Sequence, residues 1–108
     1  MRLVREIYRV TAAFPEQERF GLTIQMRRAA VSIPSNIAGG AARGGRAELL
    51  RFLAIARGSL AELDTQLWTA RDLEFFDDAQ SLQSALQLLN ARLNALISAN
   101  RSRMGHTQ

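Results

Sequence analysis

The chain contains no cysteine and no lysine, and it has few prolines, glycines and aromatic residues. The lack of cysteine excludes disulfide bonds, thiolate zinc sites and cysteine nucleophiles. Two prolines and seven glycines in 108 residues are too few for a chain that is mostly disordered. Leucine and alanine are abundant where aromatic residues are scarce, and that balance favours helices over sheets.

Long apolar runs are also missing. The longest span only a few residues, such as Ala29–Val31, whereas a membrane-spanning helix needs about 20. Glu6 and Arg9 interrupt any apolar core of a secretory signal near the N-terminus. The chain is 47% hydrophobic, which is enough for one core. We therefore expect a single domain over residues 1–108, soluble and cytoplasmic, with no membrane contact.

Charge is distributed unevenly along the chain. Residues 1–57 carry ten arginines and four glutamates, a balance of +6. Residues 58–108 carry four arginines and six acids, a balance of −2, and the two halves sum to the net charge of +4. A basic half beside a mildly acidic half can attract an anionic partner, or it can pair with the acidic half of another copy.

The spacing of apolar residues predicts four helices. They run from about Arg2 to Ala13, from between Pro15 and Arg19 to about Ala42, from about Arg46 to Leu73, and from about Ala79 to Asn100, with a frayed tail at 101–108. Pro34 cannot donate a hydrogen bond to Ala30, so we expect a kinked second helix rather than two helices meeting there. Asp77 or Asp78 is the expected N-cap of the last helix. Short turns between amphipathic helices favour an all-α, antiparallel up-down-up-down four-helix bundle.

Single residues within these helices carry further expectations. Phe20 and Phe52 lie on apolar stripes and are expected in the core. Gly58, in the middle of the third helix, costs about 1 kcal/mol relative to alanine, and close approach of a neighbouring helix would explain it. Trp68 lies off the centre of its stripe, which fits either a contact between subunits or packing at the bundle edge. The first helix has about half the length of the others, so one groove of the bundle should be incompletely covered.

The sequence offers no set of residues for catalysis. The one histidine, His106, lies in the predicted frayed tail, where a base or metal ligand would lack fixed neighbours. Acids gather at Glu62 and Asp64 and at 72–78, but a di-metal bundle needs Glu-x-x-His pairs, which are missing. The glycine-rich run 39–45 lacks Gly-Lys-Ser/Thr and follows a helix, so it is no phosphate loop. We predict that the chain is not an enzyme and binds no cofactor or metal.

Arginines around the second and third helices are the candidate functional residues. Phosphate contacts need cations that sum along one surface. Six arginines meet that description: Arg27, Arg28, Arg43, Arg46, Arg51 and Arg57. The alternative is an ordinary solvated face with salt bridges to Glu48 and Glu62. Because no aromatic residue other than Phe52 lies beside them, nucleic-acid binding should use the backbone and depend weakly on base sequence.

Two segments resemble a known family. The first is 20–38, which contains the run Arg-Arg-Ala-x-x-Ser-Ile-Pro-x-Asn-Ile-Ala, and the second is 51–67. With Glu6-Ile7-Tyr8 and Phe14-Pro15, they resemble the bacterial four-helix bundle proteins of the 23S rRNA intervening-sequence family. The resemblance covers about residues 3–73, and beyond Leu73 only the helical pattern agrees.

The resemblance implies an antiparallel four-helix bundle that assembles into a ring-like homopentamer. It also implies kinship with the accessory variability proteins of diversity-generating retroelements, basic pentamers that bind reverse transcriptase and nucleic acid. Members usually have glutamate where this chain has Gly39, which implies a looser end of the second helix. They also tend to have more residues before the first helix, so pentamer contacts from that segment are expected to differ here.

The charge distribution, the missing catalytic sets and the resemblance together predict a non-enzymatic, homo-oligomeric scaffold. Its arginine-rich surface is expected to bind the backbone of RNA or DNA. The alternative is a protein–protein interaction adaptor with no nucleic-acid role, in which the basic half docks an acidic partner such as a polymerase or another subunit.

Overall fold

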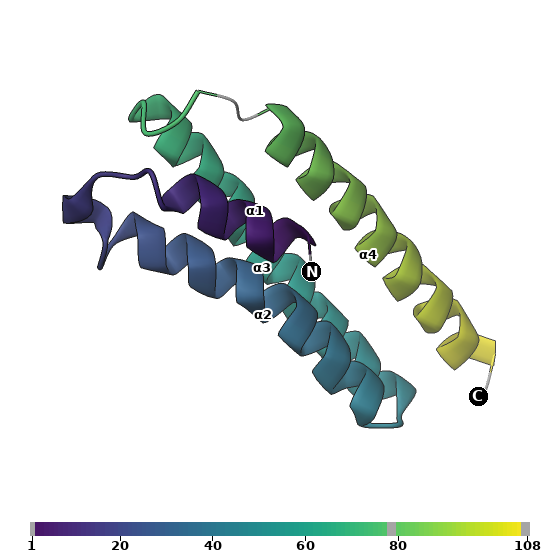
Figure 1. The fold of residues 1–108 in the computed structure, drawn as a ribbon. Coiled ribbons are helices and arrows are strands. Elements are labelled where there is room, and N and C mark those ends of the chain that lie inside the picture. The colour runs from purple at the N-terminus through teal and green to yellow at the C-terminus, as the bar shows by residue number, and fades with distance from the viewer. Residues whose placement is uncertain (1, 78–79, 107–108) are drawn as a thin grey trace.

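The computed structural model describes residues 2–77 and 80–106, with the side chains of 104–106 excepted. Within this part of the chain there are four α-helices, one short 3-10 helix and no strand (Figure 1). The elements are α1 (Arg2–Thr11), η1 (Glu16–Glu18), α2 (Leu22–Ala42), α3 (Arg46–Asp72) and α4 (Gln80–His106). The predicted all-α class with four helices is confirmed.

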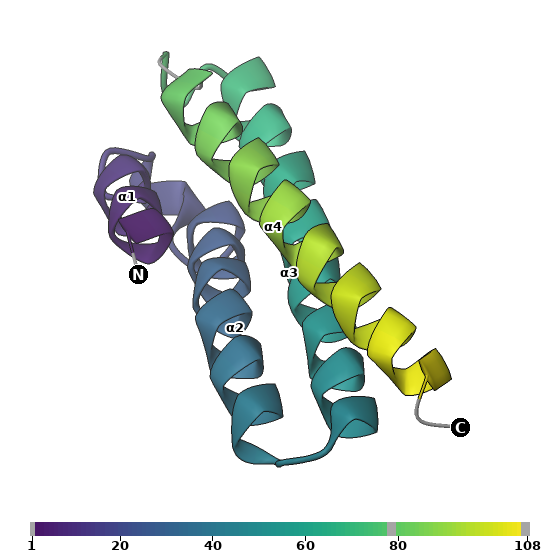
Figure 2. The same ribbon diagram turned by 90° about the vertical axis from the view of Figure 1, so that its right-hand side faces the viewer.

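The helices pack along one another in an elongated molecule of 52 × 23 × 19 Å. α2 and α3 lie side by side and are joined by a short turn at 43–45, and α4 lies along α3 (Figures 1 and 2). α1 packs on α2 far from that turn and also touches α4. These contacts are compatible with the predicted antiparallel order. With 10 residues against the 27 of α4, α1 can cover only part of that helix's length.

Local sequence sets the ends of the first two helices. α1 ends at Thr11, and the N–H of Ala13 bonds the carbonyl of Val10 in a turn that leads to Pro15. Glu16–Glu18 form η1, and α2 begins only at Leu22. The predicted start of the second helix is therefore corrected to a position several residues later, because the chain turns between the two elements.

α2 runs through Pro34 as one helix, which the apolar spacing favoured over two separate helices. Two residues earlier, the hydroxyl of Ser32 lies 2.8 Å from the hydroxyl of Ser59 on α3. Asn36 Nδ2 donates to the same Ser32 hydroxyl at 2.9 Å and to the Ser32 carbonyl at 2.7 Å. The bond between Ser32 and Ser59 ties α2 to α3 beside the proline, and the kink itself stays a prediction.

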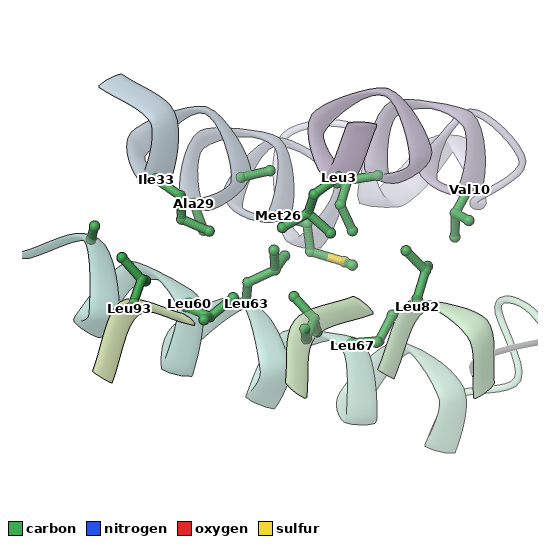
Figure 3. Packing of buried hydrophobic residues seen from close by; sticks show 14 of the residues in the cluster. Leu3, Val10, Met26, Ala29, Ile33, Leu60, Leu63, Leu67, Leu82 and Leu93 are labelled. Carbon is green, nitrogen blue, oxygen red and sulfur yellow. The ribbon is translucent and has the colours of Figure 1, made fainter. Parts of the chain in front are cut away.

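One apolar cluster joins the four α-helices (Figure 3). Its buried side chains are Leu3, Ile7 and Val10 of α1; Phe14 of the turn after α1; Met26, Ala29, Ala30 and Ile33 of α2; Leu53, Ala56, Leu60, Leu63, Leu67 and Ala70 of α3; and Leu82, Leu86, Leu93 and Ile97 of α4. They recur every three or four residues, which is the spacing of one helix face. Burying each large side chain contributes about 1.5–3 kcal/mol, so this cluster holds the helices together.

Three expectations about single residues are wrong. Phe20 is 83% exposed, because it precedes the first residue of α2, and Arg19 lies over its ring instead. Phe52 is only partly buried and lies outside the core cluster. Gly58 is exposed, and a Cβ there would meet nothing within 4 Å, so no neighbouring helix approaches it. The close approach occurs at Gly40, where a Cβ would lie 2.8 Å from the Cβ of Phe52.

The last helix is longer than predicted. α4 continues to His106, beyond the expected end at Asn100, because 101–104 contain neither proline nor glycine. The fraying of 101–108 concerns motion and stays a prediction. Asp78, the alternative N-cap, and Ala79, the predicted first residue, lie outside the described residues, as does the side chain of His106. Nowhere in the described helices is there a segment long and apolar enough to cross a membrane.

Candidate functional site

The six predicted arginines fall into separate places rather than one surface. Arg43, the C-cap of α2, and Arg46 and Arg51, in the first turns of α3, gather at the α2–α3 turn. Arg27 and Arg28 lie earlier on α2, about 22 Å from that turn at 1.5 Å per residue. The remaining arginine lies in the middle of α3. The turn is therefore where the structure concentrates predicted site residues.

The geometry of the turn brings two of these guanidinium groups to one ring. Gly44 has φ +78°, which side-chain-bearing residues rarely adopt, so the chain reverses tightly between α2 and α3. Arg43 Cζ then lies 5.2 Å, and Arg51 Cζ 4.8 Å, from the centroid of the Phe52 ring. Phe52 lies close to Gly40, where an added Cβ would be 2.8 Å from the Cβ of Phe52. Cation–π attraction thus holds two like charges near each other.

Glu48 is the acid within this cluster. Arg51 donates from Nε to Oε1 of Glu48 at 3.3 Å and from Nη2 to Oε2 at 3.2 Å. The hydrogen bond from Arg51, its charge and the charge of Arg43 lower the pKa of Glu48 below its ordinary 4.5. Arg43, Arg46 and Arg51 set against Glu48 leave a net charge of +2 at the turn. The predicted alternative of a salt bridge therefore holds for Glu48.

Arg27 joins α2 to α1. Its Nε donates to Thr11 Oγ1 at 2.8 Å, its Nη2 donates to the Tyr8 carbonyl at 3.5 Å, and its guanidinium lies 4.6 Å from the Tyr8 ring centroid. Thr11 is 2% exposed and donates in turn to the Ile7 carbonyl at 2.7 Å. Arg27 Nε and Nη2 are therefore engaged within the chain, which spacing alone does not reveal.

The remaining predicted residues differ in whether they have a bonding partner within the chain. Arg57 Nη1 donates to Asn94 Oδ1 at 3.1 Å and so links α3 to α4. Glu62, expected to pair with an arginine, instead accepts a hydrogen bond from Gln66 Nε2 at 3.3 Å. Arg28 and Arg46 are exposed and form no ion pair with any residue that the structure describes. These two arginines, with Arg43 of the turn, keep their charge available to a partner.

A shallow hollow between α1 and α2 was missed by sequence reasoning. It is lined by Tyr8, Ile24, Arg27, Arg28, Val31 and Ser32. Tyr8 and Val31 are 44% and 40% exposed, so apolar side chains of both helices reach the surface here. The apolar face of α2 is wider than the part that α1 covers, so residues at its edge stay exposed to water. α1 is too short to cover more of α2. Apolar groups beside a free cation suit a protein partner.

Trp68 lies at the edge between α3 and α4. It is 45% exposed, the Arg71 guanidinium lies 5.2 Å from its ring, and it lines a hollow with Asp64, Leu86 and Asn90. This position is compatible with both predictions, a subunit contact and edge packing. No three histidine, aspartate or glutamate side chains gather closely enough to hold a metal ion among the residues with described positions.

These features define the class: an all-α protein of four packed helices that presents arginines at one helix turn. The sequence model of the family described as 23S rRNA-intervening sequence protein matches residues 1–96. Because the match covers most of the 108 residues, the chain belongs to this family. The match extends past Leu73, where the motif resemblance ended. A search among curated proteins returned no match.

Proposed function

We propose that this chain is a non-enzymatic, homo-oligomeric helical scaffold of the cytoplasm that binds the backbone of RNA or DNA. The observation that carries this proposal is the group of Arg43, Arg46 and Arg51 at the α2–α3 turn, with a net charge of +2 after Glu48 is counted. Cations grouped on one surface attract phosphates without reading bases. Phe52, with two guanidinium groups near its ring, is poorly placed to stack on a base, so weak sequence preference is expected.

Family membership and the resemblance to accessory variability proteins support the assembly in this proposal. The helices follow an antiparallel up-down-up-down order with a bend at Pro34, and five copies form a ring. A ring multiplies the turn cluster, so several weak sites act together on one nucleic acid. A reverse transcriptase is a candidate protein partner.

A salt titration with one matched pair of variants tests the proposal. Arg46→Gln removes an exposed cation of the turn, and Arg5→Gln removes an exposed cation of α1. Both lower the net charge by one, but only Arg46→Gln should weaken binding clearly and reduce the salt slope by about 0.9 for double-stranded DNA. Absence of any association with RNA or DNA at low salt, or equal effects of the two variants, would refute the proposal.

The second candidate is a protein–protein adaptor, which the hollow formed by Tyr8, Val31 and Arg28 favours. Arg28→Glu reverses an exposed charge there, while Arg27, which anchors α1, is left unchanged. Loss of nucleic-acid binding with an intact oligomer supports the first function. Dissociation into monomers, measured by light scattering, supports an interface between chains at this hollow.

A further inference from the structure

Glu48 holds the two donors of Arg51 that a phosphate would also use. Arg51 Nε and Nη2 each donate to a different carboxylate oxygen of Glu48, at 3.3 and 3.2 Å. Arginine binds phosphate through the same planar fork of two N–H groups. The carboxylate and an incoming phosphate therefore compete for one pair of donors.

The pair lies where a nucleic acid can reach it. The side chains of Arg51 and Glu48 are 58% and 45% exposed. Ion pairs in such surroundings are weak, because water solvates both partners. Arg43 also acts on Glu48 through its charge and lies over the same Phe52 ring as Arg51. A phosphate that displaces the carboxylate thus finds two guanidinium groups already assembled.

We infer that Glu48 is an internal competitor for phosphate at the α2–α3 turn, an inference that rests on the proposed function. The carboxylate neutralises one of the three arginines in the absence of ligand. A single inorganic phosphate must displace it with little other contact. A nucleic-acid backbone also contacts Arg43 and Arg46, so successive phosphates overcome the competition together. The turn therefore favours polyphosphodiesters over isolated anions.

Glu48→Gln removes the competing charge and keeps the shape of the side chain. At about 0.1 M salt we expect about fivefold tighter binding of a single-stranded RNA or DNA probe, because a unit charge lies a few ångströms from the bound phosphate. Glu16→Gln is the matched control, because Glu16 pairs with Arg19 at 3.4 Å with the same i,i+3 spacing. That pair precedes α2 and is separated from the turn by about 30 Å of helix. Because charges are screened within about 10 Å, Glu16→Gln should change the affinity for the probe less than about twofold.

A double-mutant cycle separates competition from a general charge effect. Arg51→Gln should cost more affinity in the Glu48→Gln background than in the natural chain. Only in that background are Nε and Nη2 of Arg51 free before the nucleic acid binds. Equal losses in both backgrounds, or equal gains from Glu48→Gln and Glu16→Gln, overturn the inference while the proposed function stands. If neither the natural chain nor Glu48→Gln binds nucleic acid at low salt, the proposed function fails and the inference fails with it.

Discussion

Replacing Gly58 or Gly40 by alanine adds one methyl group to the interior of a helix in two different environments. Gly58, on α3, is exposed, and an added Cβ would meet no atom within 4 Å. Gly40, on α2, is buried, and an added Cβ would lie 2.8 Å from the Cβ of Phe52 and 3.4 Å from the Cα of Leu49. The two substitutions should therefore change stability in opposite directions.

The magnitudes follow from helix propensity and packing. Gly58→Ala gains only the propensity difference, about 0.8–1.0 kcal/mol. Gly40→Ala gains at most the same amount, but overpacking costs about 1–3 kcal/mol. The upper half of that range applies, because the nearest atom, at 2.8 Å, is the Cβ of Phe52, which cannot move aside as the flexible end of a side chain can. The net result is a loss of about 1–2 kcal/mol.

Gly39→Ala provides a control between the two. Its Cβ would lie 3.4 and 3.5 Å from ring carbons of Phe52, close to ordinary contact, so a gain like that at Gly58 is expected. Urea unfolding followed by circular dichroism at one fixed protein concentration measures all three, because oligomer stability depends on concentration. If Gly40→Ala stabilised the chain as much as Gly58→Ala, the close packing of α2 on α3 would be refuted. Destabilisation by Gly58→Ala would mean that another chain covers this surface.

Other substitutions test the core, the α1–α2 link and the turn. Leu63→Ala, at a fully buried position of α3, should cost about 2–5 kcal/mol in urea unfolding, and a cost below 1 kcal/mol would argue against the packing. Thr11→Val should cost about 1–3 kcal/mol, because it leaves the Nε of Arg27 without its acceptor; an unchanged midpoint would exclude that role. The folded-state pKa of Glu48 is lowered, so its contribution to stability is present above its ordinary pKa of 4.5 and lost as pH falls through the folded-state value. A carboxyl NMR titration should show that lowered pKa, and Arg51→Gln should move it back toward 4.5; an unchanged value in Arg51→Gln would contradict the pairing.

Much of the fold could be predicted because burial repeats with the period of a helix. In α4, the predicted stripe residues Leu82, Leu86 and Leu93 are buried, whereas Leu96 is 42% exposed and the neighbouring Ile97 is buried instead. Periodicity does not say where a helix starts, however, and Phe20 was placed on a stripe although α2 begins two residues later. Periodicity also does not say which glycine faces a neighbouring helix. The close approach was therefore predicted at Gly58, whereas the structure has it at Gly40.

The candidate site was less predictable, because the state of an arginine depends on acceptors far away in the chain. Arg27 meets an acceptor on Thr11, 16 residues earlier, and Arg57 meets one on Asn94, 37 residues later. Neither contact leaves a local signal in the sequence. Among the six predicted arginines, the ion pair of Arg51 with Glu48 has the i,i+3 spacing that sequence inspection can find.

The number of arginines that are free to meet phosphate sets the expected strength of salt dependence. Of the six predicted, Arg27 and Arg57 bond to other helices, which leaves Arg28, Arg43 and Arg46, and also Arg51 once a phosphate displaces Glu48. Four phosphate contacts per chain predict a log–log salt slope of about −3.6 on double-stranded DNA, whereas six predict about −5.4. A measured slope near the larger value would mean that Arg27 and Arg57 also contact phosphates, through N–H donors that their bonds to Thr11, Tyr8 and Asn94 do not use.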